Sequence, residues 1–282
     1  MTTVEQRLRQ PAEEARQRGR SGSGWYAWLA RAGLVAKGVS FAIVAVLAIK
    51  LAIGHGGDAT SREGALHALA GKSFGVVVLV LLAIGFAAYA IWRFVEAWAA
   101  PGEDAKKWAK RAGSVGRGLV YAALAYSTVK LLVGEGGSGS QNERARETAG
   151  TLFSWPAGTW LVGIAGAIVI GVGLWNLYRG LARKFEKRWR TGEMGATARR
   201  WASRVGALGH VARGVVFGLI GVFVIKAALE YDPKEAIGLD GALQKLASAA
   251  YGPYLLGLTA AGLLAYGVYC LVDARYRDVS AG

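Results

Sequence analysis

The fold is decided by residues 37–50, Lys37-Gly38-Val39-Ser40-Phe41-Ala42-Ile43-Val44-Ala45-Val46-Leu47-Ala48-Ile49-Lys50, because their pattern occurs three times along the chain. Arg117-Gly118 leads through a second apolar run to Lys130, and Arg213-Gly214 leads through a third to Lys226. In every copy the basic residue stands thirteen positions before the lysine. Such a repeat predicts one structural unit used three times, whose copies bury the same face against one another.

Small residues recur on one face of each of these helices, four and seven positions after the glycine. They let two helix backbones approach closely in lipid, where dispersion drives association. We therefore expect this face to pack helices together; the alternative is that the three faces line a narrow pore. The three sets are Gly38, Ala42 and Ala45; Gly118, Ala122 and Ala125; and Gly214, Gly218 and Gly221.

A second apolar helix follows in each copy and carries a glycine four residues before an aromatic residue. Because each copy then has two spans, all copies enter the membrane in the same direction and are related by an axis along the membrane normal. The sequence predicts six transmembrane helices in three tandem hairpins with a pseudo-threefold arrangement. The second-helix pairs, whose glycines are further candidates for helix packing, are Gly85 and Tyr89, Gly171 and Trp175, and Gly262 and Tyr266.

The composition is that of a membrane protein. Of the 282 residues, 53% are hydrophobic and 41 are glycine, and the mean hydropathy is +0.30. These values are unusual for a soluble chain. We expect an all-α integral protein of the bacterial cytoplasmic membrane. Its expected parts are a basic cytoplasmic tail at 1–24 and repeats of two spans at 25–101, 105–187 and 199–276.

The net charge of +15 is confined to alternate polar segments. Residues 1–37, 93–117, 179–213 and 273–282 hold 25 of the 34 lysines and arginines but only 10 of the 19 acidic residues. By the positive-inside rule, this distribution predicts that both termini are cytoplasmic. Anionic phospholipids are the expected partners of these basic segments. Nucleic acid is not, because no basic stretch is interleaved with aromatic residues that could stack on bases.

The polar connections are expected to differ between copies. Residues 54–73 and the segment that begins at Gly241 have helical spacing, and both predict short interfacial helices on the outer face. The second copy has Gly-Gly-Ser-Gly-Ser at 136–140 and charged residues at 142–147, which predict a looser loop. The segment 21–24, Ser-Gly-Ser-Gly, predicts a flexible joint after the basic tail.

A longer combination of residues also recurs. It comprises Arg31-Ala32-Gly33, Lys37-Gly38, Gly64-Ala65-Leu66, Gly85 and Tyr89 in the first copy; Arg111-Ala112-Gly113 and Arg117-Gly118 in the second; and Arg213-Gly214, Gly241-Ala242-Leu243, Gly262 and Tyr266 in the third. The combination resembles the uncharacterised bacterial membrane family called domain of unknown function 1206. The resemblance covers roughly residues 25–276, although the second copy lacks a Gly-Ala-Leu segment. It implies an integral membrane protein of six spans, without an activity or site that could be transferred.

The sharpest functional hypothesis concerns Lys50, Lys130 and Lys226, which lie near the outer ends of the three first helices. If their faces turn inward, three ammonium groups meet at the pseudo-threefold axis and form an anion-selective ring. If the faces turn outward, the same lysines extend to lipid phosphates. Both interpretations remain open at this stage.

The repeated basic residues Lys37, Arg117 and Arg213 are expected to line the inner interface, with Glu96 and Asp273 as their acidic partners. Ion pairs at the interface and contacts to anionic lipid are one interpretation of this set. A cytoplasmic gate for a substrate is the other.

Enzyme function is not expected. The three histidines fall on different predicted sides of the membrane, and we find no Ser-His-Asp set, phosphate-binding loop or cysteine pair. No metal or cofactor is expected. The sequence leaves two functions open. One is a channel- or transporter-like protein for a small or anionic solute, and the other is a structural or accessory membrane subunit that binds anionic lipid or a protein partner. A homo-oligomer is a further possibility that the sequence does not decide.

Overall fold

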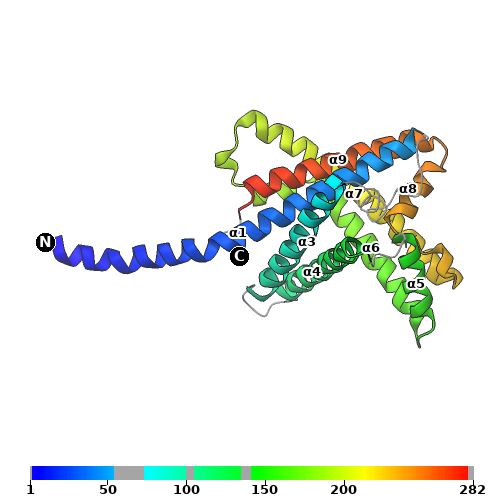
Figure 1. The fold of residues 1–282 in the computed structure, drawn as a ribbon, viewed down its shortest axis with the longest axis horizontal. Coiled ribbons are helices and arrows are strands. Elements are labelled where there is room, and N and C mark those ends of the chain that lie inside the picture. The colour runs from blue at the N-terminus through cyan, green and yellow to red at the C-terminus, as the bar shows by residue number, and fades with distance from the viewer. Residues whose placement is uncertain (1, 54–72, 100–104, 135–140, 279–282) are drawn as a thin grey trace.

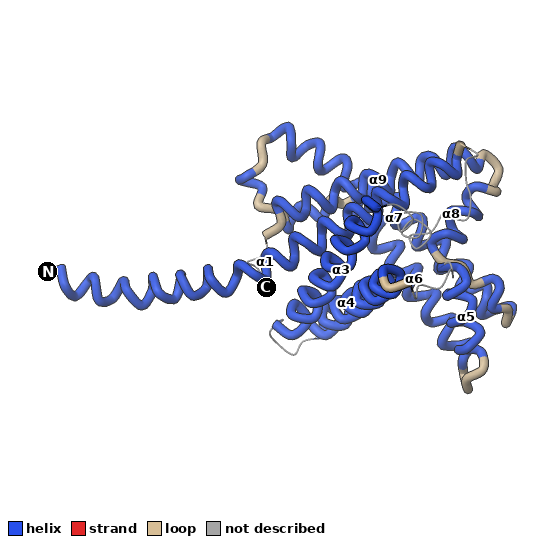
Figure 2. Tube along the Cα trace, in the orientation of Figure 1, coloured by secondary structure: helices blue, strands red, loops and turns tan. Residues whose placement is uncertain are grey.

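The computed structural model describes residues 2–53, 73–99, 105–134 and 141–278, and the structure is built from helices (Figures 1 and 2). Within these ranges the chain forms no strand beyond an isolated bridge between Trp189 and Arg277. The elements are α1 (Thr2–Ala52), α3 (Ser73–Ala99), α4 (Ala105–Leu132), α5 (Gln141–Phe153), α6 (Gly158–Leu181), η1 (Lys184–Arg188), η2 (Thr191–Glu193), α7 (Ala196–Glu230), η3 (Pro233–Glu235), α8 (Leu239–Ala247) and α9 (Gly252–Tyr276).

Five of these helices are long and apolar enough to cross a membrane. They comprise 24–52 of α1, 75–99 of α3, 158–181 of α6, 196–230 of α7 and 252–276 of α9. The length and composition of these helices indicate a multi-pass membrane protein. The remaining long helix, α4, has only twelve residues between Arg117 and Lys130 that are free of charge. Its apolar run is shorter because charged residues occupy its first half.

The most extensive helix contacts join one repeat to the next. The second long helix of the first repeat packs along the first long helix of the second repeat, as α3 against α4, and α6 packs in the same way along α7. The third such pair is α9 and α1, which joins the last repeat to the first; these two helices run side by side in Figure 1. The three repeats are therefore connected to one another by the same kind of contact.

The glycine after each repeated basic residue lies at one of these three contacts. A Cβ atom on Gly38 of α1 would stand 2.9 Å from the carbonyl oxygen of Gly267 in α9. A Cβ on Gly214 of α7 would stand 2.9 Å from the carbonyl oxygen of Gly173 in α6, and one on Gly118 of α4 would lie against the Phe94 ring of α3. Backbones that approach this closely require small residues.

Contacts within a repeat are less uniform. Gly85 of α3 lies against Ala36 of α1, and Gly262 of α9 lies against Ala212 of α7, so both pairs of helices touch through a glycine and an alanine. The equivalent Gly171 of α6 has open space around it. Accordingly α4 and α6 are not among the closely packed pairs, whereas α1 packs on α3 and α7 packs on α9. In the second repeat the two long helices, α4 and α6, are therefore separated from each other.

The turns that lead into α6 and α9 have the same construction. Ala157 and Tyr251 each adopt a left-handed backbone conformation with φ of 61°. The next residue is Gly158 or Gly252, and a Cβ atom there would overlap the carbonyl oxygen of the preceding short helix. Only glycine fits such an approach, which is why each short helix can turn directly into a long one.

The connections agree only in part with the sequence predictions. The helix expected from Gly241 onwards is α8, whereas the helix predicted at 54–73 falls on residues 54–72, which lie outside the described ranges. The looser loop predicted in the second copy is wrong for residues 142–147, because they lie in α5, which packs on α6 and α8; residues 136–140 lie outside the described ranges. Ala145, Ala149, Leu152 and Phe153 recur at helical spacing and give α5 an apolar face that the neighbouring helices bury. Residues 21–24 continue α1 without a break, so the predicted joint is helical in the structure.

Candidate functional site: a cationic cluster between the repeats

Lys37 is a charged residue in the middle of the bundle, where only 8% of it is exposed. Its ammonium group lies 5.6 Å from the centre of the Tyr89 ring in α3 and 5.2 Å from that of Tyr266 in α9. Aromatic faces attract cations through their quadrupole, and the attraction strengthens when the cation is desolvated. The sequence predicts Lys37 at the inner interface, and packing of α3 and α9 around α1 encloses its side chain.

Arg213 of α7 meets the same tyrosine from the other side. It donates a hydrogen bond to the Tyr266 hydroxyl, and its guanidinium carbon lies 5.5 Å from the centre of the Phe41 ring and 4.9 Å from that of Phe217. The buried Nε atom of Arg213 has no hydrogen-bond partner among the described residues. A buried guanidinium donor without an acceptor is costly.

Arg93 of α3 is 3% exposed and connects Tyr89 to a carboxylate. Its guanidinium donates hydrogen bonds to the Tyr89 hydroxyl, at 2.6 Å, and to Glu96. Its buried Nε atom, like that of Arg213, has no partner among the described residues. Tyr89 is therefore bound by one cation at its hydroxyl group and approached by a second, Lys37, over its ring.

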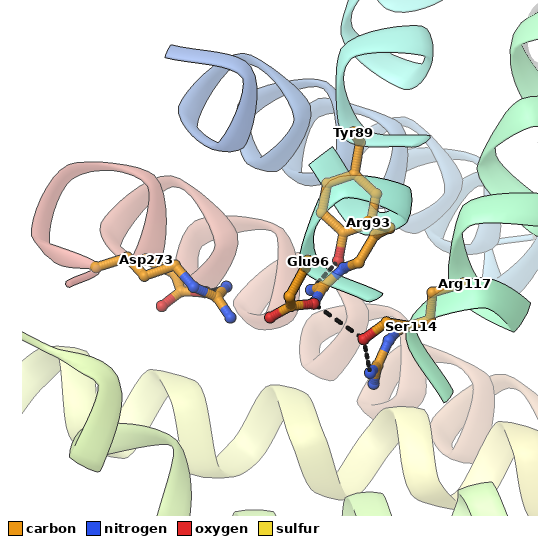
Figure 3. Close-up of polar contacts among 7 residues, drawn as sticks. Tyr89, Arg93, Glu96, Ser114, Arg117 and Asp273 are labelled. Carbon is orange, nitrogen blue, oxygen red and sulfur yellow. Dashed lines mark hydrogen bonds and ion pairs between the residues drawn. The ribbon is translucent and has the colours of Figure 1, made fainter. Parts of the chain in front are cut away.

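Glu96 extends the network to α4. Ser114 donates to the Glu96 carboxylate at 3.0 Å and accepts from Arg117 at 3.3 Å (Figure 3). All three repeated basic residues thus belong to one connected set, although they come from three different repeats. We call this set the cationic cluster; its members are Lys37, Tyr89, Arg93, Glu96, Ser114, Arg117, Arg213 and Tyr266.

The cluster holds four cations and one carboxylate, so its formal charge is strongly positive. Charged groups inside a membrane bundle are expensive and mark functional sites by default. Hydrogen bonds to tyrosine hydroxyls and contacts with ring faces offset part of that cost. The excess of cations favours the binding of an anion.

Asp273, expected beside the repeated basic residues, has other partners. It accepts from Arg277 at 2.7 Å and from the indole of Trp189 at 3.1 Å, and Figure 3 shows it apart from the Glu96 network. Nearby in η1, desolvation and then the guanidinium groups of Arg277 and Arg179 lower the pKa of Arg188. The end of the bundle that carries η1 is therefore also rich in positive charge.

The three outer lysines have separate surroundings. Lys226 pairs with Glu235 at 3.0 Å and with Glu230 at 3.6 Å, Lys130 lies over the Tyr126 ring of its own helix, and Lys50 is exposed in the last turn of α1. None of the contacts of the described residues joins two of these lysines. Of the two repeated basic sets, the structure brings together the one at Lys37, Arg117 and Arg213.

A cleft opens beside the cluster, where α4 and α6 are not packed together. Its volume is about 560 Å³, and it is lined mainly by apolar residues of α4, α5, α6, α7 and the segment around η3. Arg213 forms part of its wall, so the cleft and the cationic cluster share one residue. Ser127 and Arg144, which are hydrogen-bonded at 3.2 Å, also line it.

Sequence reasoning did not find Arg93, Ser114 or the cleft as parts of a site. The repeated Gly-x-x-x-aromatic pattern could have indicated this network, because its aromatic residues Tyr89 and Tyr266 are the ones that bind the cations. The equivalent Trp175 has no hydroxyl group and is 56% exposed. No group of three His, Cys, Asp or Glu side chains in the described ranges could hold a metal ion.

Comparison with known proteins agrees with the repeat. A family model described as "Domain of Unknown Function (DUF1206)" matches three regions, 32–100, 112–183 and 208–277. The uncharacterised protein YxxB of Bacillus subtilis (strain 168) is 29% identical over 259 residues, which cover 91% of this chain and 93% of that protein. No solved structure matches the chain.

Proposed function

Since the chain belongs to the family described as Domain of Unknown Function (DUF1206), whose description states no activity, we propose a function from the geometry. The protein binds an anion at the cationic cluster and acts in the manner of a channel- or transporter-like protein for a small or anionic solute. The observation that carries the proposal is that Lys37, Arg117 and Arg213, one from each repeat, reach one connected set with a single carboxylate. Binding is proposed without catalysis.

We propose that α4 also crosses the membrane, so that it and the five apolar helices form six spans. The support is the packing of α4 along α3, in which the Tyr121 ring lies 4.4 Å from Tyr89 and 5.8 Å from Phe86, centre to centre. A helix packed along a membrane span shares its depth, and long basic side chains at its ends can extend to the headgroups. The α9–α1, α3–α4 and α6–α7 pairs support a pseudo-threefold arrangement of the repeats.

The proposed location is the bacterial cytoplasmic membrane, with both termini in the cytoplasm. Six spans place the two ends of the chain on one side, and the positive excess of the segments around η1 supports the cytoplasm as that side. Anionic phospholipids are the proposed neighbours of these segments.

Aromatic rings fill the space between the repeats. Phe41 and Tyr266 lie 4.8 Å apart, and Tyr89 and Tyr121 lie 4.4 Å apart, measured between ring centres. This packing favours a closed binding site over an open pore, so movement of a solute needs a conformational change. The same closure supports the second candidate, a structural or accessory subunit that binds anionic lipid or a partner protein.

The test is anion binding by the purified full chain in detergent. Phosphate, sulfate, acetate and chloride are titrated while the thermal unfolding temperature is followed, because a ligand that binds the folded state stabilises it in proportion to the logarithm of its concentration. We expect at least one anion to raise this temperature in the native protein. In Lys37→Met and Arg213→Met the increase is expected to be lost, since both changes keep the apolar bulk and remove the charge.

Lys130→Met is the matched control, because Lys130 lies outside the cluster on α4. It is expected to respond to anions as the native protein does. Loss of the response in Lys130→Met, with the response kept in Arg213→Met, would move the site to the outer lysines. Anion flux into liposomes then separates the two candidate functions: flux that depends on Arg213 supports transport, whereas binding without flux supports the accessory subunit.

A further inference from the structure

The cleft beside the cluster runs along one face of α7. The residues of α7 that line it are Arg213, Val216, Phe217, Ile220 and Val224, which share a helical face. From Val224 to Arg213 this face is about 16 Å long at the helical rise of 1.5 Å per residue. The cleft therefore has a long apolar wall that ends at a guanidinium group.

The opposite walls are also apolar. Val120, Ala123 and Leu124 of α4 and Val162 and Ala165 of α6 line the cleft, and Leu263 of α9 contributes as well. Its volume of about 560 Å³ falls within the range of roughly 300–1,000 Å³ that is usual for small-molecule sites. Such sites are mostly apolar and contain a few polar groups that fix the orientation of the ligand.

The apolar walls of the cleft and the positive charge of Arg213 together determine which kind of ligand fits it. An apolar molecule without charge would bring no negative charge to Arg213 in the wall of the cleft. A small inorganic anion would satisfy Arg213 but would leave the apolar walls uncovered. A ligand with an anionic group and a hydrocarbon chain matches both parts of the cleft.

We propose that the anion bound by the cationic cluster is amphiphilic: a single-chain organic anion whose carboxylate, or an equivalent group, binds Arg213 while its chain lies in the cleft between α4 and α6. The cleft has one continuous apolar wall that leads to Arg213, so it matches one chain. This inference rests on the proposed function and names the class of its ligand. Ser127 and Arg144, which are hydrogen-bonded to each other, also line the cleft.

The experiment measures the binding of acetate, hexanoate, octanoate and decanoate to the full chain in detergent micelles. Two variants fill the cleft from facing helices, Ala123→Trp on α4 and Ala165→Trp on α6. The control is Ile168→Trp on α6, because Ile168 is 62% exposed and does not line the cleft. The hydrocarbon chains of these acids also partition into the micelle. The affinity of the native protein is therefore divided by that of a variant in the same detergent, so that the partitioning cancels.

We expect this ratio to be close to one for acetate and to rise to about tenfold for decanoate in both cleft variants. The rise is smaller than transfer of the chain from water would give, because the micelle competes for it. Ile168→Trp is expected to keep the native affinity for every chain length, and Arg213→Met to weaken acetate and decanoate alike.

The possible failures are distinct. If acetate binds the cluster but the ratio stays near one for all chains, the amphiphilic ligand is excluded while anion binding stands. If no anion binds, the proposed function fails as well. Native mass spectrometry supplies a further test. The single-chain ligand would also be overturned if a two-chain phospholipid is bound to the native protein, is absent from Ala165→Trp and is not displaced by decanoate.

A second measurement does not depend on the folding of the tryptophan variants. A decanoate with a photoreactive diazirine at the end of its chain is cross-linked to the native protein, and the labelled peptides are mapped. Adducts on the walls of α4, α6 and α7, reduced by excess decanoate, are expected. Adducts spread over the lipid-facing surface, unaffected by competition, would count against the cleft.

Discussion

Lys37 and Glu96 show how single residues set the charge of the cluster. Lys37 is held by two tyrosine rings, and Glu96 accepts hydrogen bonds from Arg93 and Ser114. The Glu96 carboxylate therefore stabilises Arg93 and lowers the positive potential of the cluster.

Glu96→Gln is expected to strengthen anion binding by about an order of magnitude, because a repulsive charge is removed at an effective dielectric constant of roughly 20. The amide retains an oxygen that can accept from Ser114, so the packing is kept. The measurement is the anion titration of the thermal unfolding temperature. Glu147→Gln on the exposed face of α5 is the control and is expected to behave as the native protein. Unchanged or weaker binding in Glu96→Gln would mean that the ligand does not approach Arg93.

The long helices show how the same sequence signal can give different contacts. Gly85, Gly171 and Gly262 hold equivalent positions, yet two of them touch an alanine of the partner helix and the third faces open space. The separation of α4 from α6 creates the cleft. The second repeat thus lacks a packing contact that the other two repeats have.

Replacement of these three glycines by alanine tests this difference. A Cβ atom would stand 2.3 Å from the Ala36 Cβ in Gly85→Ala and 2.2 Å from the Ala212 Cβ in Gly262→Ala, so a helix must move in each case. We expect each change to cost about 1–3 kcal/mol, as overpacking does. Gly171→Ala meets no neighbour within 4 Å and is expected to leave stability unchanged or slightly raised, since alanine favours helix.

Thermal unfolding of the three variants in one detergent provides the measurement, and Gly171→Ala serves as the internal control. Equal losses at all three positions would contradict the open second repeat. In that case α4 and α6 would pack as the other pairs do.

The whole molecule is held together by contacts between repeats, and the pair α9 and α1 joins the last repeat to the first. The protein has six spans if α4 crosses the membrane as α3 does, and five spans if α4 does not cross it. An even number of spans places the two termini on one side, whereas five spans would place them on opposite sides. The sidedness of a few positions therefore decides the topology.

Single cysteines at 187 in η1, 147 in α5 and 249 after α8, each introduced with Cys270→Ala, are expected to label with membrane-impermeant thiol reagents. Positions 147 and 249 should react from outside intact cells, and position 187 only after the membrane is opened. A cysteine at position 5 should behave as the one at 187 does. Labelling of position 5 from outside would reduce the number of spans to five. Cys270 itself is fully buried, so the unmodified protein is the low-background control.

The sequence by itself determined the features that are local or periodic: the helices, the threefold repeat and the segregation of positive charge. Apolar runs and glycine spacing encode these features directly. Only the tertiary structure decided that Lys37 lies between two tyrosine rings, that Glu96 accepts a hydrogen bond from Ser114 of the next helix, and that the repeat containing Gly171 opens into a cleft. These features depend on how far each helix is rotated and on which neighbour it meets, and both follow from contacts between residues far apart in the chain.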